Sequence, residues 1–176
     1  MHDPLKHMEI RRGLPNNAFG MVRNNGTRPH QGWDLWAPVG TQIFAVADGV
    51  VQFVRTNSGA YGTQICASFQ DPRNTEQSAE LFAFYAHLSQ LYVAAGNSVV
   101  EGQVIGLTGK SGNASGFTSI EDEHLHFEVR TQAAPGRGLG GRIDPAIIFG
   151  YDLLTSRIDP AAPECSLDEE VDICPA

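Results

Sequence analysis

The chain lacks the features that mark several common classes of protein. Its 176 residues include only 12 lysines and arginines, which form no basic run, and the net charge is −8 at pH 7. An acidic surface offers nothing to phosphate backbones or anionic lipids, so we expect no binding to nucleic acid and no membrane insertion. No apolar stretch approaches the roughly 20 residues that a membrane-spanning helix requires.

A secretory signal is also missing from the printed N-terminus. Residues 1–8 read MHDPLKHM and have no apolar centre of the kind that a signal peptide contains. Two interpretations stay open. Either the sequence is a mature form without its signal, or the protein leaves its cell by a route that uses none.

Cysteine is scarce. Only three cysteines occur and no Cys-x-x-Cys pair is present, which argues against a zinc site built from cysteine alone. Cys66 lies in the apolar run 63–69 and is therefore expected to be a buried thiol. Cys165 and Cys174 lie in a Pro-rich, acidic tail, and the sequence leaves open whether they form a disulfide.

Helical periodicity is scarce as well, whereas 19 glycines and 10 prolines indicate many turns. Short runs rich in β-branched or aromatic residues have the length of strands: residues 42–47, 49–55, 62–70, 81–88, 99–104 and 124–130. They predict a mainly β fold built on an antiparallel β-sheet, with long loops and few short helices. We expect a hairpin formed by 62–70 and 80–88. A short helix or turn is expected at 89–94 and another at 145–151.

The length suits a single domain with additions at both ends. Residues 1–29 are rich in Gly, Asn and Pro and are expected to be an N-terminal loop segment. Residues 30–150 should form the core. Residues 151–176 should form an acidic, Pro-rich tail.

A histidine and an aspartate flank a glycine in the segment His-Gln-Gly-Trp-Asp, residues 30–34. Side chains four residues apart share a face of an extended strand, so His30 and Asp34 should point the same way, with Gly32 leaving space for an ion. An imidazole and a carboxylate that converge in this way are natural zinc ligands. The same residue types also make ordinary turns, so the segment alone does not decide.

A second polar group lies in residues 124–129, HLHFEV. Strand alternation places the leucine, phenylalanine and valine on one apolar face and His124, His126 and Glu128 on the other. Two imidazoles on one face can supply a metal ligand and a neighbouring acid–base group. The alternative is the exposed polar face of an edge strand.

A third segment contains His87, which shares a predicted strand face with Tyr85. Taken alone, such a histidine is more often hydrogen-bonded scaffolding than a catalytic group. Apart from His2 and His7 near the terminus, however, all the histidines of the chain fall in these three strand-like segments. Their concentration favours a common site.

Taken together and in this order, the segments His-x-Gly-x-Asp, Tyr-Ala-His-Leu and His-Leu-His-Phe-Glu-Val-Arg resemble the lysostaphin/LytM-type zinc endopeptidases of peptidase family M23. The similarity covers roughly residues 28–149 and includes the intervening pieces 37–41, 47–51, 99–106 and 144–145. The resemblance implies an antiparallel, duplicated-hybrid-like sheet whose groove holds the metal. It also implies cleavage of peptide bonds in bacterial peptidoglycan.

Residue by residue, the resemblance makes His30, Asp34 and His126 the ligands of a Zn²⁺ ion, and His87 and His124 the catalytic histidines. Three protein ligands leave a fourth tetrahedral position for water, as in catalytic zinc sites. Zinc lowers the pKa of that water to about 7 and polarises the scissile carbonyl.

Two further groups of assignments complete the expected mechanism. We assign His124 as general base and His87 as transition-state donor, and on sequence grounds these two roles are interchangeable. Tyr85 and Glu128 are expected to orient the histidines.

The chain departs from the family pattern just before its paired histidines. Residues 117–123 separate a Gly-rich turn from His124 and bring in Glu121, Asp122 and Glu123. We expect these three acids to lie beside the site and to reshape the substrate groove.

The sequence thus predicts a zinc-dependent endopeptidase that hydrolyses the peptide cross-links of peptidoglycan outside the cytoplasm, in the periplasm or after secretion. One alternative is a catalytically silent module that activates a partner wall hydrolase, and another is a zinc peptidase acting on a non-wall protein. A further hypothesis is an antibacterial effector delivered into a competitor's periplasm, whose partner would be an immunity protein. The bond that is cut and the oligomeric state are not determined by the sequence.

Overall fold

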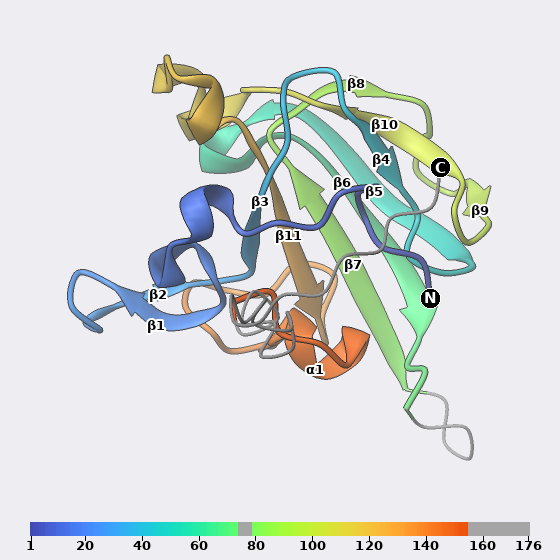
Figure 1. Cartoon of the computed structure of the whole chain (residues 1–176). Coiled ribbons are helices and arrows are strands. Elements are labelled where there is room, and N and C mark those ends of the chain that lie inside the picture. Colours follow the sequence, from blue (N-terminus) through green and yellow to red (C-terminus); the bar gives the residue numbers. More distant parts are fainter. Residues whose placement is uncertain (74–78, 155–176) are drawn as a thin grey trace, which may run out of the picture.

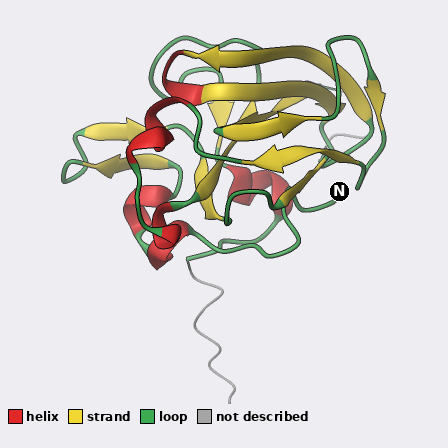
Figure 2. Cartoon of the chain, turned by 90° about the horizontal axis from the view of Figure 1, so that it is seen from above, coloured by secondary structure: helices red, strands yellow, loops and turns green. Residues whose placement is uncertain are grey.

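The structure is a computed structural model of the chain, and it describes residues 1–73 and 79–154. Its mainly β, antiparallel architecture confirms the predicted fold class. The long strands β5, β6, β7 and β11 lie side by side (Figure 1). Helices in the described part of the chain are few and short (Figure 2).

The largest sheet has seven strands, all paired antiparallel. In spatial order it contains β12 (Arg142–Ile143), β11 (His124–Arg130), β7 (Glu80–Ala86), β6 (Gly62–Gln70), β5 (Gly49–Ser58) and β9 (Ser98–Val99). The seventh strand, β3 (Trp33–Trp36), also pairs with β11. Strand β11 therefore has partners on both edges. This excludes the alternative in which His124 and His126 lie on the exposed face of an edge strand.

Two smaller sheets complete the β structure. One contains β4 (Gln42–Phe44), β10 (Val104–Thr108) and β8 (Leu88–Leu91), and the other pairs β1 (Gly20–Arg23) with β2 (Arg28–His30). The helical elements are the 3-10 turns η1 (Arg11–Gly13), η2 (Pro15–Asn17), η3 (Gly59–Tyr61), η4 (Gly112–Gly116) and η5 (Ile120–Asp122), and the helix α1 (Pro145–Phe149). No helix in residues 1–73 and 79–154 is long and apolar enough to span a membrane.

The predicted local elements had different outcomes. The hairpin is confirmed, because β6 and β7 pair in register from Ile65 opposite Tyr85 to Gln70 opposite Glu80. The short helix near residue 145 is confirmed over α1, with Pro at its first position. The helix or turn expected at 89–94 was wrong, since residues 89–91 belong to β8, which pairs with β10 and has an extended backbone.

Strand alternation gives the large sheet two different faces. One face packs against the three-stranded sheet of β4, β10 and β8. The main apolar core lies between them and includes Ile43, Ile65, Tyr85, Ile105, Leu125 and Phe127. The other face carries a smaller apolar cluster of Cys66, Phe82, Phe84 and Ala86. Cys66 is thus buried, as predicted. The polar side chains of β11 alternate with its core residues and so belong to this second face.

The first 29 residues were expected to be a loop segment, and they contain β1 and two 3-10 turns as well as loops. Leu5 and Ile10 are buried in the main core, and Ile10 forms a bridge with Leu35 of β3. This segment therefore packs as part of the same domain. The proposed disulfide of Cys165 and Cys174 lies outside the described residues.

Candidate metal centre

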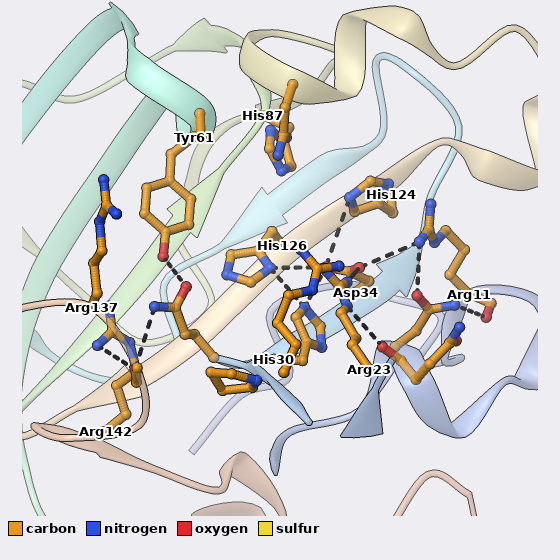
Figure 3. Close-up of a pocket in the computed structure, with 18 of the residues that line it drawn as sticks. Arg11, Arg23, His30, Asp34, Tyr61, His87, His124, His126, Arg137 and Arg142 are labelled. Carbon is orange, nitrogen blue, oxygen red and sulfur yellow. Dashed lines mark hydrogen bonds and ion pairs between the residues drawn. The ribbon is translucent and has the colours of Figure 1, made fainter. Parts of the chain in front are cut away.

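The large sheet brings together the histidines and the aspartate that the sequence singled out. Asp34 of β3 lies opposite His126 of β11 in the strand register, and His30 ends β2. His124 lies two residues before His126 on the same strand, and His87 follows the last residue of β7. All five side chains are buried and converge from three regions that are distant in sequence, residues 30–34, 87 and 124–126 (Figure 3).

Three of these residues can hold a metal ion. Asp34 Oδ1 lies 3.1 Å from His30 Nε2 and 2.8 Å from His126 Nδ1. The two imidazole nitrogens are 3.4 Å apart. One carboxylate oxygen and two ring nitrogens therefore surround a common point.

In each candidate ligand histidine, the ring nitrogen that faces away from the common point donates a hydrogen bond to a protein acceptor. His30 Nδ1 donates to the carbonyl of Ala18 at 2.8 Å, and His126 Nε2 donates to Glu128 Oε1 at 2.9 Å. The other nitrogen of each ring is thereby presented toward the common point. Acceptors of this kind fix the tautomer and orientation of histidines that bind metals.

The remaining two histidines are oriented in the same way. His87 Nδ1 donates to the carbonyl of Ser111 at 2.9 Å, and His124 Nδ1 donates to the carbonyl of Asp122 at 2.7 Å. Because a carbonyl only accepts, the neutral form of each ring carries its proton on Nδ1 and offers an unprotonated Nε2. The two rings lie 5.1 Å apart, beside the three candidate ligands.

Burial and charge set the ionisation of the cluster. Burial lowers the pKa of His87 to about 3, with further lowering from His126 and His124 nearby. Burial also lowers the pKa of His124. Both imidazoles are therefore neutral near pH 7, which is the state in which a histidine accepts a proton.

The position between the ligands favours positive charge. Burial opposes a charged His126, but its hydrogen bonds to Asp34 and Glu128 outweigh the burial and raise its pKa to about 9. Burial likewise opposes a charged Asp34, and the neighbouring histidines, His124 first, hold the pKa of that carboxyl well below its usual range. A site that stabilises a carboxylate and attracts a proton in this way also suits a divalent cation.

Glu128 accepts a hydrogen bond from His126 and belongs to a buried network of charged and polar side chains. Its Oε1 accepts from His126 and, at 2.7 Å, from the hydroxyl of Tyr61. Its Oε2 accepts from the Nε atoms of Arg130 and Arg142, each at 2.7 Å. The supporting role expected of Glu128 thus matches its contacts, while its partners Tyr61, Arg130 and Arg142 were not singled out from the sequence.

Of these missed partners, Arg130 had a usable signal, because it continues the alternation that places Glu128 on the polar face of β11. Tyr61 and Arg142 come from a turn and a short strand that carry no such pattern.

The expected role of Tyr85 was wrong. Its side chain is buried in the main core, and its hydroxyl accepts a hydrogen bond from the amide of Val46 at 3.2 Å. His87 does not share its face, because His87 has a left-handed backbone with φ of 66° that ends the alternation of β7. This turn directs the His87 ring toward the candidate metal ligands instead.

The structure requires glycine at position 32 for a different reason from the one that the sequence suggested. A Cβ atom at this position would lie 2.0 Å from the carbonyl oxygen of Phe127 and 2.9 Å from the Cγ of Glu128. Glycine is thus required where the segment between β2 and β3 passes against β11, and the space for an ion lies elsewhere. His30 and Asp34 still converge, across an interruption between two strands.

The three acids expected beside the site are directed elsewhere. Glu121 and Asp122 pair with Arg12 at 2.9 and 2.8 Å, and Glu123 lies 3.7 Å from Lys110. None of the three lines the groove that holds the histidines. Arg12 of η1 ties the N-terminal segment to η5. The three acidic side chains therefore do not line the groove themselves. Asp122 still lies beside the site, because its carbonyl accepts from His124 Nδ1 and its Oδ1 lies 3.8 Å from Nη1 of the groove residue Arg11.

A cavity of about 1080 Å³ opens over the cluster. The candidate ligands and both further histidines line it, together with residues of β1, β2, η2, η3, η4 and the loop after β11. Such a groove is large enough for an extended peptide segment, and the arrangement of metal ligands and neutral histidines on its floor is suited to hydrolysis of a peptide bond.

Comparison with known proteins agrees with this geometry. The family model described as peptidase family M23 matches residues 28–138. A relative from Vibrio cholerae named peptidoglycan DD-endopeptidase ShyA is 31% identical over 118 residues. That match covers 67% of this chain and 24% of the relative, so the chain spans about a quarter of the relative's length.

Solved structures show the same fold. The catalytic domain of the prophage-encoded M23 protein EnpA from Enterococcus faecalis superposes with a TM-score of 0.56 at 28% identity, over 73% of this chain and 85% of that one. A zinc-containing peptidase from Vibrio cholerae superposes with a TM-score of 0.51 at 29% identity, over 72% of this chain and 35% of that one.

Proposed function

Because the chain belongs to peptidase family M23, we propose that it is a zinc-dependent endopeptidase that hydrolyses the peptide cross-links of bacterial peptidoglycan. The convergence of Asp34 Oδ1, His30 Nε2 and His126 Nδ1 carries the proposal. Their separations of 2.8, 3.1 and 3.4 Å are close to the roughly 3.3 Å expected between ligands of tetrahedral zinc. The relative named as a peptidoglycan endopeptidase supports the substrate.

His30, Asp34 and His126 would hold the ion, and the bound zinc would acidify a water molecule and polarise the scissile carbonyl. His124 is the proposed general base, since its Nε2 is unprotonated and lies 3.8 Å from Asp34 Oδ1, which would stabilise the imidazolium that forms. His87 is the proposed donor to the developing oxyanion. Its only proton in the neutral state lies on Nδ1 and is donated to the Ser111 carbonyl, so His87 would act as donor from Nε2 only as the imidazolium. The second proton would come from solvent water in the open groove before the reaction, and it would stay on Nε2 while it hydrogen-bonds to the oxyanion.

The substrate lies outside the cytoplasm, so we place the site of action in the periplasm or beyond the cell. The three converging candidate ligands and the buried, neutral His87 and His124 favour an active enzyme over a silent module that activates a partner hydrolase. An effector role with an immunity protein as partner stays a hypothesis.

Digestion of purified peptidoglycan sacculi tests the proposal. The zinc-loaded protein should release muropeptides with new peptide ends, identified by mass spectrometry, and a chelator or the substitution His126→Ala should abolish the release. His7→Ala is the matched control, because His7 is an exposed histidine outside the groove. Absence of new peptide ends, or release that resists chelation, would contradict the proposal. Cleavage that requires a partner hydrolase and survives His124→Ala would support the regulatory alternative instead.

A further inference from the structure

The groove has the opposite charge to the protein as a whole. The chain carries a net charge of −8, yet the charged side chains that line the groove, apart from the histidines, are one aspartate and five arginines. These residues are Asp34 and Arg11, Arg23, Arg28, Arg137 and Arg142. In Figure 3, Arg137 and Arg142 lie on one side of the histidine cluster and Arg11 on the other, while Arg23 lies next to Asp34.

Three of the five arginines are occupied by the carboxylates of the site. Asp34 Oδ2 lies 2.7 Å from Arg23 Nη2 and 3.5 Å from Arg11 Nη2. Arg142 Nε donates to Glu128 at 2.7 Å. Their charge is therefore balanced within the protein, and they are structural parts of the groove.

Arg28 and Arg137 are different. Both are exposed, and neither forms an ion pair with any residue in 1–73 or 79–154. Arg28 begins β2, two residues before the candidate ligand His30. Two guanidinium groups that have no carboxylate partner among the described residues thus line the groove that leads to the candidate metal site.

The backbone around Arg137 is held in place. Arg142 Nη1 donates to the carbonyls of Gly136 and Gly138 at 2.8 and 3.0 Å, so both neighbours of Arg137 are anchored. Gln31, which follows His30, also donates to the carbonyl of Gly138 at 3.3 Å. The loop that carries Arg137 is therefore fastened to the segment that carries the first candidate ligand.

We propose that Arg28 and Arg137 bind free carboxylates of the peptide substrate, which deepens the proposed function and rests on it. A guanidinium pairs with a carboxylate through two parallel N–H donors, and such pairs orient a ligand as well as attract it. The favoured substrates are cross-link peptides with free carboxylates near the scissile bond. Peptides whose carboxyl groups are amidated, and neutral glycine bridges, lack the groups that these arginines recognise.

A matched pair of synthetic cross-link peptides tests this recognition. The two peptides differ only in whether their carboxyl groups are free or amidated, and kcat/KM is measured for each with the zinc-loaded protein. We expect the free carboxylates to be preferred about tenfold, because two charge-assisted contacts distinguish the peptides. In the double variant Arg28→Gln/Arg137→Gln, the ratio should fall to about two or less.

The control is the double variant Lys6→Gln/Arg55→Gln, which removes two positive charges from exposed positions outside the groove and should keep the tenfold ratio. Equal cleavage of both peptides by the unmodified protein would overturn the inference. So would a preference that persists in Arg28→Gln/Arg137→Gln.

Peptide binding, measured by calorimetry, separates this inference from the proposed function. If neither peptide is cut but the free form binds about tenfold more tightly and the arginine variant loses the difference, the endopeptidase proposal fails and carboxylate recognition stands. If both peptides are cut and bound alike, the endopeptidase proposal stands and carboxylate recognition fails.

Discussion

The substitution Glu128→Gln tests whether the buried network under His126 stabilises the domain and its metal site. Glu128 is fully buried and accepts four hydrogen bonds, two on each carboxylate oxygen. Glutamine has the same shape, but its amide nitrogen only donates. Whichever carboxylate oxygen this nitrogen replaces, it would face two hydrogen-bond donors. Either the two arginines or the His126 and Tyr61 pair would lose an acceptor.

The cost follows from these contacts. A buried donor left without a partner costs about 1–3 kcal/mol, and removal of one member of a buried ion pair costs about 3–5 kcal/mol. We therefore expect the free energy of unfolding to fall by about 3 kcal/mol. Zinc affinity should weaken by about 10–100-fold, because His126 loses the carboxylate that fixes its ring.

Urea unfolding of the zinc-free protein measures the first effect, and competition with a chromogenic chelator measures the second. Glu80→Gln is the control, because Glu80 is exposed at the start of β7, and its effect should stay within about 0.5 kcal/mol. A loss below about 1 kcal/mol for Glu128→Gln, together with unchanged zinc affinity, would refute the reasoning.

The pH dependence of the same variant has a defined sign. Burial disfavours the charged carboxylate, but the donors, His126 first and then Arg130, hold the pKa of Glu128 well below its usual range. A depressed folded-state pKa contributes stability above the unfolded-state value of about 4.3, and the contribution is lost as the pH falls below it. The difference in stability between the unmodified protein and Glu128→Gln should therefore narrow in acid, and a difference that widens below pH 4 would contradict this account.

Three further predictions follow from individual contacts. His124→Gln and His87→Gln should each lower kcat by about 10²–10⁴-fold while the protein still binds one zinc ion. Hydrolysis rates and metal analysis measure the two effects. Loss of zinc in either variant would contradict the assigned roles. Gly32→Ala should lower the melting temperature by about 5 °C or more, because its Cβ would lie 2.0 Å from a backbone oxygen of β11; an unchanged melting curve would show that the strands separate easily. Burial raises the pKa of Cys66 to about 12, so brief iodoacetamide treatment at pH 8 should leave it unmodified in peptide mass maps unless the protein is first unfolded.

The residues of the candidate site were largely accessible from local patterns. In β11 the alternation of polar and apolar residues placed His124, His126 and Glu128 on one face, and the structure has them there. Strands β6 and β11 begin and end where the sequence indicated. Alternation is a property of the extended backbone itself, so it can be read without knowing what the strand packs against.

The contacts of the site depended on segments that meet only in the folded chain. The left-handed backbone of His87 reversed the face that alternation predicted for it. Tyr61 and Arg142 reached Glu128 from a turn and a short strand without any periodic signal. The acids before His124 were expected beside the groove, but Glu121 and Asp122 form ion pairs with Arg12 of the N-terminal segment.

The sequence by itself determined the β architecture and the set of histidines and carboxylates available for a metal site. Only the tertiary structure decided which nitrogen each histidine presents, which charges are balanced, and which groove arginines have no carboxylate partner within residues 1–73 and 79–154. The physical reason is range. Strand propensity and side-chain alternation act over a few residues and can be recognised locally. The hydrogen bonds and ion pairs of a buried site join segments that are distant in sequence, and nothing in the local pattern shows that these segments meet.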